Sequence, residues 1–251
     1  MRGPSGLQPT PRALDLAEPL SHALADIQRT LAFTQAFDPG SSALMFTLGL
    51  SEHPTFVLLP RLVARLREVA PAITLRVRSF TARDDAVTML DAGEVDLAIG
   101  VPPTSQAGRI LIRPLFEERF VCVLRRGHPA AELPLDLPAF LALSHLLVSP
   151  ENERFGHVDA ALAKRGLKRR LALTLPQMYA APTLVARSDM IATLMAGVIP
   201  AFGHADWLTV VDPPLDLDPV PFVMSWHRRN DAHPAQHWLR EVTALLFTPE
   251  P

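Results

Sequence analysis

The first part of the chain carries a narrow stripe of apolar side chains at helical spacing. Its members follow one another at steps of three or four residues: Leu20, Leu24, Ile27 and Leu31. Such spacing is typical of a helix that pairs with a second helix along one apolar seam. We therefore predict a linker helix over residues 14–37 that dimerises through these side chains. Packing of this helix on the chain's own globular body stays open as the alternative.

After the linker helix, short apolar runs alternate with amphipathic stretches. Strands are predicted over residues 44–50, 73–77 and 95–100, where apolar side chains alternate with polar ones or form a continuous run. Residues 56–69 and 84–92 show the helical period. The predicted buried face of the first of these helices comprises Leu59, Leu62, Val63, Leu66 and Val69. This order predicts parallel strands joined by right-handed crossover helices.

A second alternation of the same kind follows. Strands are expected over residues 109–115, 119–125, 146–149, 171–175, 207–211 and 222–226. Helices are expected over residues 157–165, 178–187, 190–196 and 234–247. Two such units in 251 residues predict a two-lobed α/β protein. Because open α/β sheets bind ligands beyond the carboxyl ends of their strands, the two facing edges would form a binding cleft.

Composition and charge narrow the function classes. Hydrophobic residues make up 48% and charged residues 20% of the chain, which is typical of a globular protein. The net charge of −2 provides no basic field for nucleic acid. Residues 1–13 lack the apolar core of a secretory signal, and no apolar run reaches the ~20 residues that a membrane span needs. We therefore expect a cytoplasmic protein without a membrane segment.

Signatures of common catalytic sites are missing from the sequence. It contains no G-x-S-x-G, G-x-G-x-x-G or G-K-[ST] motif. His233 and His237 have the spacing of metal ligands on a helix, but no glutamate lies between them, so a metal site is disfavoured. Cys122 lies within an apolar strand and is expected to be a buried, inert thiol. The basic run over residues 164–170 is interpreted as solvated cations at a helix end rather than a phosphate site.

Several short motifs, taken in order, resemble those of one protein family. Residues 7–14 (LQPTPRAL) look like the end of a winged helix-turn-helix that passes into a linker helix, and residues 37–39 (FDP) look like the junction after it. The stretches 156–170, 226–229 and 234–240 continue the likeness. Together they resemble the LysR-type transcriptional regulators, in particular the branch of nodulation activators and regulators of chlorinated-aromatic degradation.

The resemblance implies a domain organisation. It predicts a two-lobed, periplasmic-binding-protein-like (type 2) regulatory domain preceded by the long linker helix. Residues 1–13 would be a remnant of the winged helix-turn-helix, most of which is expected to be missing. Regulatory subdomain I would comprise residues 43–114 plus 222–251, and subdomain II would comprise residues 115–221. The expected hinge consists of the two crossings between the subdomains.

Candidate effector-binding residues follow from their positions after predicted strands. In the first lobe they are Ser51, Thr55, Thr81, Pro102 and Thr104, and in the second lobe Ser149, Asn152 and Tyr179. The family resemblance supports Ser51, Thr81 and Pro102 more than the others. A hydroxyl at a helix start also suits a helix cap with no ligand, which stays the alternative for each of them. Apart from Arg83 and His53, no basic residue lies near the predicted strand ends. Because the predicted cleft offers so few positive charges, we expect a neutral or weakly anionic effector.

The leading hypothesis is the effector-binding and dimerisation portion of a transcriptional regulator. It would sense a small, possibly aromatic molecule, act as a homodimer or homotetramer, and reach DNA only through the missing helix-turn-helix. A solute receptor of a transport system is the first alternative, against which the absent signal peptide and the apolar seam argue. An enzyme on the same two-lobed fold is the second alternative, against which the absent catalytic motifs argue. No cofactor and no metal are expected.

Overall fold

The structure is a computed structural model. It describes residues 10–13, 16, 19–20, 24, 37–104, 108–132, 134–150, 154–203 and 205–247, together with the backbone of β1 (Arg2–Gly3) and β2 (Gly6–Leu7), which pair antiparallel. Most of the predicted linker helix, including Ile27 and Leu31, lies outside the described residues. Leu20 and Leu24 are described, and their side chains are 57% and 58% exposed. These two seam positions are therefore mostly exposed within the chain itself.

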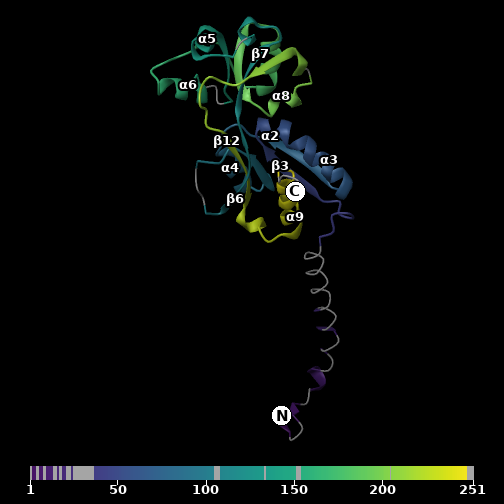
Figure 1. The fold of residues 1–251 in the computed structure, drawn as a ribbon. Coiled ribbons are helices and arrows are strands. Elements are labelled where there is room, and N and C mark those ends of the chain that lie inside the picture. The colour runs from purple at the N-terminus through teal and green to yellow at the C-terminus, as the bar shows by residue number, and fades with distance from the viewer. Residues whose placement is uncertain are drawn as a thin grey trace.

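The first lobe, lobe I, is built on a five-stranded sheet (Figure 1). Its strands, in spatial order, are β4 (Thr74–Ser79), β3 (Met45–Leu50), β5 (Leu97–Gly100), β12 (Val220–His227) and β6 (Ile110–Glu118). Strands β4, β3 and β5 are parallel, which confirms the predicted crossover unit. Strand β12 returns from the end of the chain and pairs antiparallel with both β5 and β6. The sheet is therefore mixed.

Helices cover both faces of the lobe I sheet. They are α2 (Glu52–Val57), α3 (Leu59–Val69), α4 (Asp85–Asp91) and α9 (Pro234–Leu245), with the short η4 (Arg228–Asn230) before α9. Leu97 and Ile99 of β5 pack in the cluster formed with α3 and α9, whereas Ala98 packs in the cluster with α4. Burial on both faces explains why this parallel strand is apolar throughout.

The helix predicted over residues 56–69 is two helices in the structure. Helix α2 begins at Glu52, just after β3, and ends at Val57, and α3 begins at Leu59. Pro60 has no N–H to donate to the preceding turn, so its position suits the first turn of a new helix. Leu62 and Leu66 are the buried residues of α3, next to the buried Leu58 that precedes the helix, while Val63 is 40% exposed, so its predicted burial is wrong.

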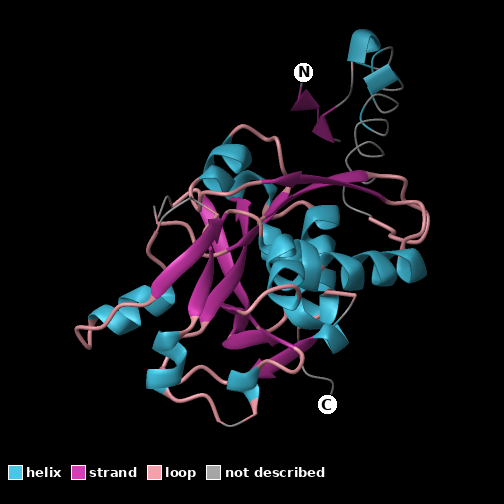
Figure 2. Cartoon of the chain, turned by 90° about the horizontal axis from the view of Figure 1, so that it is seen from above, coloured by secondary structure: helices cyan, strands magenta, loops and turns pink. Residues whose placement is uncertain are grey.

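The second lobe, lobe II, has its own five-stranded sheet. The spatial order is β11 (Leu208–Val211), β7 (Phe120–Arg125), β10 (Met190–Met195), β8 (Ser144–Val148) and β9 (Arg170–Leu175). Its helices are η1 (Pro129–Ala131), α5 (Leu137–Ala142), α6 (His157–Ala163), η2 (Met178–Ala180), α7 (Ala181–Ala186), α8 (Val198–Ala201) and η3 (Ala205–Trp207). Figure 2 shows these helices around the strands. The two-lobed α/β fold is thus confirmed.

The prediction of a helix over residues 190–196 is wrong, because this segment is the central strand β10. Its methionine, alanine and leucine residues favour helices, and a short apolar run has no period that tells a strand from a helix. Tertiary pairing decides the conformation. Ala192 pairs with Leu146 of β8 on one side and with Val123 of β7 on the other.

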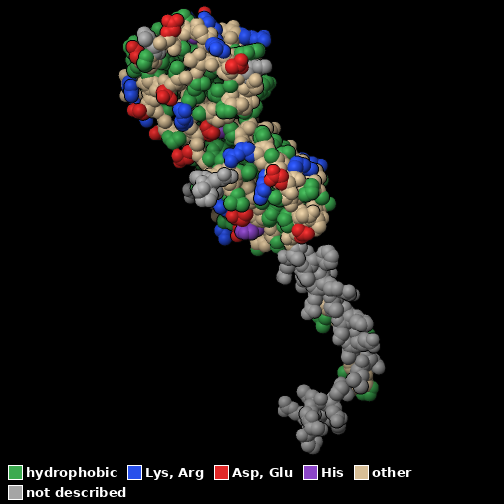
Figure 3. Space-filling model, turned by 45° about the vertical axis from the view of Figure 1, so that its right-hand side comes forward, with side chains coloured by type: hydrophobic (Ala, Val, Ile, Leu, Met, Phe, Trp, Pro, Cys, Tyr) green, Lys and Arg blue, Asp and Glu red, His purple; other side chains and the backbone are tan. Residues whose placement is uncertain are grey.

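The chain passes between the lobes at the end of β6. Strand β6 stays in the lobe I sheet as far as Glu118, and β7 begins in lobe II at Phe120. The return passage follows β11 and leads into β12. Charged side chains of both signs are scattered over both lobes, in keeping with the near-neutral net charge (Figure 3). No helix among the described residues is long and apolar enough to cross a bilayer.

Candidate functional site

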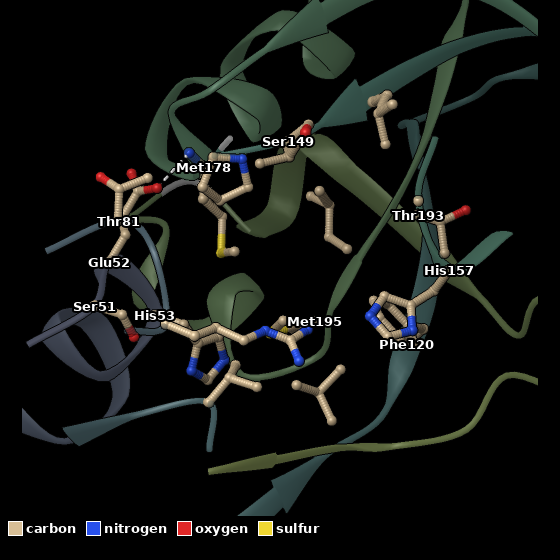
Figure 4. A pocket seen from close by; sticks show the side chains of 18 of the residues that line it. Ser51, Glu52, His53, Thr81, Phe120, Ser149, His157, Met178, Thr193 and Met195 are labelled. Carbon is tan, nitrogen blue, oxygen red and sulfur yellow. Dashed lines mark hydrogen bonds between the residues drawn. The ribbon is translucent and has the colours of Figure 1, made fainter. Parts of the chain in front are cut away.

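A cavity of about 710 Å³ lies between the two lobes, and both lobes line it (Figure 4). Lobe I contributes the segments that follow β3, β4 and β5, as expected for the carboxyl edge of a parallel sheet. Lobe II contributes the segment after β8 and parts of α6 and β10. Phe80, Phe120 and Phe222 provide aromatic wall on this cavity. Its volume lies within the roughly 300–1,000 Å³ that is usual for small-molecule sites.

Ser51 lies where β3 ends and α2 begins. Its backbone N–H donates to the carbonyl of Ile99 at 3.1 Å, which fixes it against the neighbouring strand β5. Its side chain makes no capping hydrogen bond to α2, and Oγ is buried without any hydrogen-bond partner among the described residues. A Cβ at Gly100 would lie 3.2 Å from this oxygen, so the glycine leaves room for the hydroxyl. The Ser51 side chain therefore does not cap α2, and its hydroxyl makes no hydrogen bond to any described residue.

His53 lies one residue into the first turn of α2 and is only 3% exposed. Its ring stacks on Phe222 with centroids 4.7 Å apart. Neither Nδ1 nor Nε2 has a hydrogen-bond partner among the described residues, and Nε2 lies 3.6 Å from Oε1 of Glu118. Burial lowers the pKa of His53 to about 4 and raises that of Glu118. The imidazole is therefore neutral at pH 7.

The segments after β4 and β5 are tied together at the cavity. The backbone N–H of Thr104 donates to Oδ1 of Asp84 at 3.0 Å, and the Thr104 hydroxyl donates to the other carboxylate oxygen. Thr81 is exposed and lines the cavity beside them. The hydroxyl of Thr104 thus holds the loop against the start of α4.

A carboxylate of lobe I bonds directly to the backbone of lobe II. Glu52 accepts the N–H of Met178 at 2.8 Å through one oxygen and the N–H of Tyr179 at 3.2 Å through the other. These N–H groups belong to the first turn of η2, where the helix cannot satisfy them itself. The contact joins the two lobes at one side of the cavity (Figure 4).

The lobe II wall contains a buried ion pair. Nε and Nη2 of Arg169 donate to the two oxygens of Asp159 at 2.9 and 2.7 Å, and the arginine side chain is 2% exposed. Burial opposes ionisation of Asp159, but the hydrogen bonds from Arg169 and the Gly156 N–H lower its pKa overall. The interpretation of residues 164–170 as wholly solvated is therefore wrong for Arg169, which lines the cavity.

The structure brings together four of the predicted effector-binding residues. Ser51, Thr81, Thr104 and Ser149 all line the cavity. Pro102 and Tyr179 are described but are not among the lining residues, and the Tyr179 side chain is 60% exposed. The Thr55 hydroxyl donates to the Ser51 carbonyl at 3.1 Å, and Thr55 lines a separate hollow beside α8. Asn152 lies outside the described residues.

Sequence reasoning missed several lining residues of lobe II. They are Phe120, His157, Arg169, Thr193 and Met195. Thr193 and Met195 lie on the segment predicted to be a helix. A helix does not place these alternate residues on one face, as the strand β10 does. Arg169 lies in a run of cations that share one pattern in the sequence, and only its pairing with Asp159 distinguishes it.

Neither the cysteine nor a metal site provides a second functional site among the described residues. Cys122 is fully buried, and burial raises its pKa to about 11, so its thiol is protonated and unreactive as predicted. Within the described part of the chain, no group of three histidine, cysteine or acidic side chains is placed to hold a metal ion.

Residues 40–245 match the family described as the LysR substrate binding domain. The chain is 34% identical to the HTH-type transcriptional activator NagR of Ralstonia sp over 251 residues, which are 99% of this chain and 82% of that protein.

Two solved structures share the fold. A probable transcriptional regulator, PA0477 of Pseudomonas aeruginosa, superimposes with a TM-score of 0.73 at 30% identity, covering 97% of this chain and 81% of that one. The regulatory domain of MexT, a transcriptional activator of the same organism, superimposes with a TM-score of 0.72 at 30% identity. The match covers 82% of this chain and 98% of that one.

Proposed function

The chain belongs to the LysR-type transcriptional regulators, and from this premise we propose that its effector binds in the cavity between lobes I and II, at Ser51, Thr81, Thr104 and Ser149. Residues 40–245 are the effector-binding domain of such a regulator. Members of this family regulate transcription and are not enzymes, so the enzyme alternative is set aside.

One observation carries the assignment of the site. The Ser51 hydroxyl is buried beside the cavity without a partner among the residues that the structure describes, and an unsatisfied buried hydroxyl costs about 1–3 kcal/mol. A bound molecule with a hydrogen-bonding group would remove this cost. The aromatic wall supports an aromatic effector, and the cation of Arg83, which also lines the cavity, supports a weakly anionic one.

The proposed mechanism is a shift between arrangements of the two lobes. A ligand that touches both cavity walls favours the arrangement in which both contacts are made. In a cytoplasmic homodimer or homotetramer held by the linker helix, this shift would move the DNA-binding domains that the family carries at its N-terminus. DNA binding itself is assigned to that domain and not to the lobes.

Calorimetry with a panel of aromatic acids tests the site. We expect binding to the wild-type chain and an about fivefold weaker affinity for Ser51→Ala, because one hydrogen bond contributes about 1 kcal/mol. Ser42→Ala is the matched control, since Ser42 does not line the cavity. Equal affinities for Ser51→Ala and the control would contradict the assignment of Ser51. Turnover of any panel member would contradict the regulator function.

A further inference from the structure

We propose that Gly197 sets the angle between the two lobes. Because this residue has no side chain, the start of α8 in lobe II can rest directly on Glu118 and on α2 of lobe I. A larger residue at this position would hold the lobes further apart. The proposal goes beyond the proposed function, because it concerns the arrangement of the lobes in the chain without a ligand.

The backbone of Gly197 does not itself require a glycine. Its φ of −62° and ψ of −17° lie in the right-handed helical region, which every residue adopts. Gly93, Gly127 and Gly166 differ, because their φ values of 70°, 69° and 68° favour glycine. At position 197 the need for a glycine therefore comes from the space around the residue.

A side chain at position 197 would collide with lobe I. A Cβ there would lie 2.8 Å from Cγ1 of Val57, whereas carbon atoms in contact are about 3.5–4.0 Å apart. Val57 is the last residue of α2, and a β-branched side chain has one strongly preferred rotamer in a helix. Leu58, which follows it, is fully buried and anchors this end of α2. The collision is therefore relieved most readily by a movement of lobe II.

Glu118 holds α8 at this short distance. Its Oε2 accepts the N–H of Gly197 at 3.0 Å, which attracts lobe II to lobe I. Its Oε1 would lie 2.5 Å from a Cβ at position 197. The same oxygen lies 3.6 Å from Nε2 of the buried His53 ring, which leaves the carboxyl group little room to move aside. One attraction and one steric limit at the same residue therefore define a single separation of the lobes.

The contact lies next to a crossing between the lobes. Glu118 is the last residue of β6, and β7 of lobe II begins at Phe120. Figure 1 shows α8 directly above α2, and the two helices are in contact. Beside this contact, α2, α3 and α8 line a hollow of about 440 Å³, so the lobes are not tightly packed there. A small displacement this close to the hinge therefore becomes a larger one at the far ends of the lobes.

Spin labels on the two lobes measure this angle. Labels on Ala64→Cys in α3 and Arg187→Cys at the end of α7 are both exposed, and α7 packs in the same cluster as α8. Dilution into a large excess of unlabelled chain restricts the electron–electron distance to one chain, and the buried Cys122 does not react. We expect the mean distance to be longer in Gly197→Ala than in the wild-type chain, and longer still in Gly197→Val.

Two further variants assign the change to the contact. Val57→Ala removes the methyl groups that meet the new Cβ, so in the Gly197→Ala chain it should return the distance part of the way to the wild-type value. Gly203→Ala is the control, because a Cβ at Gly203 meets nothing within 4 Å, and it should keep the wild-type distance.

The proposal also predicts that the variant chains fold. Each lobe has its own buried core, so a wider angle leaves both cores intact. Circular dichroism and urea unfolding check this for every variant. A wild-type distance in both Gly197→Ala and Gly197→Val would overturn the proposal. A Gly197→Ala chain that does not fold would overturn it as well, because the lobes could then not separate at this contact. Neither outcome bears on ligand binding in the cavity, which calorimetry measures separately.

Discussion

Burial lowers the pKa of two of the described histidines, His53 and His145, to about 4, so both are neutral at pH 7. His145 is fully buried in lobe II, where its Nε2 lies 2.8 Å from the carbonyl of Phe140, and burial lowers its pKa to about 4. His53 has the same direction of shift at the cavity. A neutral ring in a folded protein has to gain its proton on unfolding below the ordinary histidine pKa of 6.5. Each residue therefore links stability to pH.

The first prediction concerns His145. Because its folded pKa is lowered, the unfolded chain binds more protons between pH 6.5 and 4, so stability is complete above pH 6.5 and falls as the pH drops. From pH 7 to pH 5 this residue should cost about 2 kcal/mol of unfolding free energy. His145→Gln keeps an amide donor for Phe140 and removes the titration, so that part of the pH dependence should disappear in urea unfolding.

The control for this measurement is His237→Gln on the exposed face of α9, which should leave the pH dependence of unfolding unchanged. The same slope in His145→Gln as in the wild-type chain would show that His145 titrates normally in the folded state. Aspartate and glutamate residues contribute equally to all three proteins, so the difference between proteins isolates the histidine.

At the scale of elements, the contact between α2 and η2 joins the lobes. Glu52 is the first residue of α2, and its carboxylate accepts two N–H groups from the first turn of η2. Both the start of α2 immediately after β3 and the start of η2 after β9 depend on the sheets of their own lobes. The two helix starts lie in contact at the cavity only when the lobes are placed as they are here. The contact between Glu52 and η2 is therefore expected to stabilise the closed arrangement of the lobes.

The second prediction concerns this contact. Glu52→Gln keeps one acceptor oxygen and loses the charge and the second bond, which should weaken closure by about 1 kcal/mol. Fluorescent labels on Thr88→Cys in α4 and Lys164→Cys after α6 would report the distance between the lobes, since Cys122 is buried and does not react. We expect a longer mean distance in Glu52→Gln. An unchanged distance, equal to that of the exposed control Glu68→Gln, would contradict this role.

The elements also show where local preference loses to tertiary pairing. β10 has the residue types of a helix and is a strand because β7 and β8 pair with it on both sides. The segment predicted as one helix is divided at Leu58, which is buried just before α3, and Val63 within α3 is exposed. In both segments the apolar character was predicted and the geometry was not.

At the scale of the whole molecule, the apolar seam of the linker helix remains a prediction about assembly. Leu20 and Leu24 are exposed within a single chain, which leaves them available to a second copy. The placement of the domain boundaries at residues 114 and 222 likewise remains a prediction. On its first passage from lobe I to lobe II, the chain leaves the lobe I sheet at Glu118 and enters the lobe II sheet at Phe120.

The third prediction tests the seam. Leu24→Arg combined with Ile27→Arg places two charges in an apolar interface, so light scattering at micromolar concentration should show the mass of one chain instead of a dimer or tetramer. His22→Arg combined with Asp26→Arg adds the same side chains off the seam and should leave the assembly intact. A wild-type mass in the seam variant would place the interface elsewhere.

The sequence by itself determined the order of strands and helices in lobe I, the two-lobed α/β class, the burial of Cys122 and the family. These follow from periodicity and from short motifs, which are local properties of the chain. The cavity follows from tertiary structure alone, because its walls come from segments more than 100 residues apart, such as Glu52 and Met178 with a separation of 126. The same reason applies to Ser51 and His53: only the packed structure shows that the Ser51 hydroxyl and the His53 ring nitrogens are buried without a partner among the described residues.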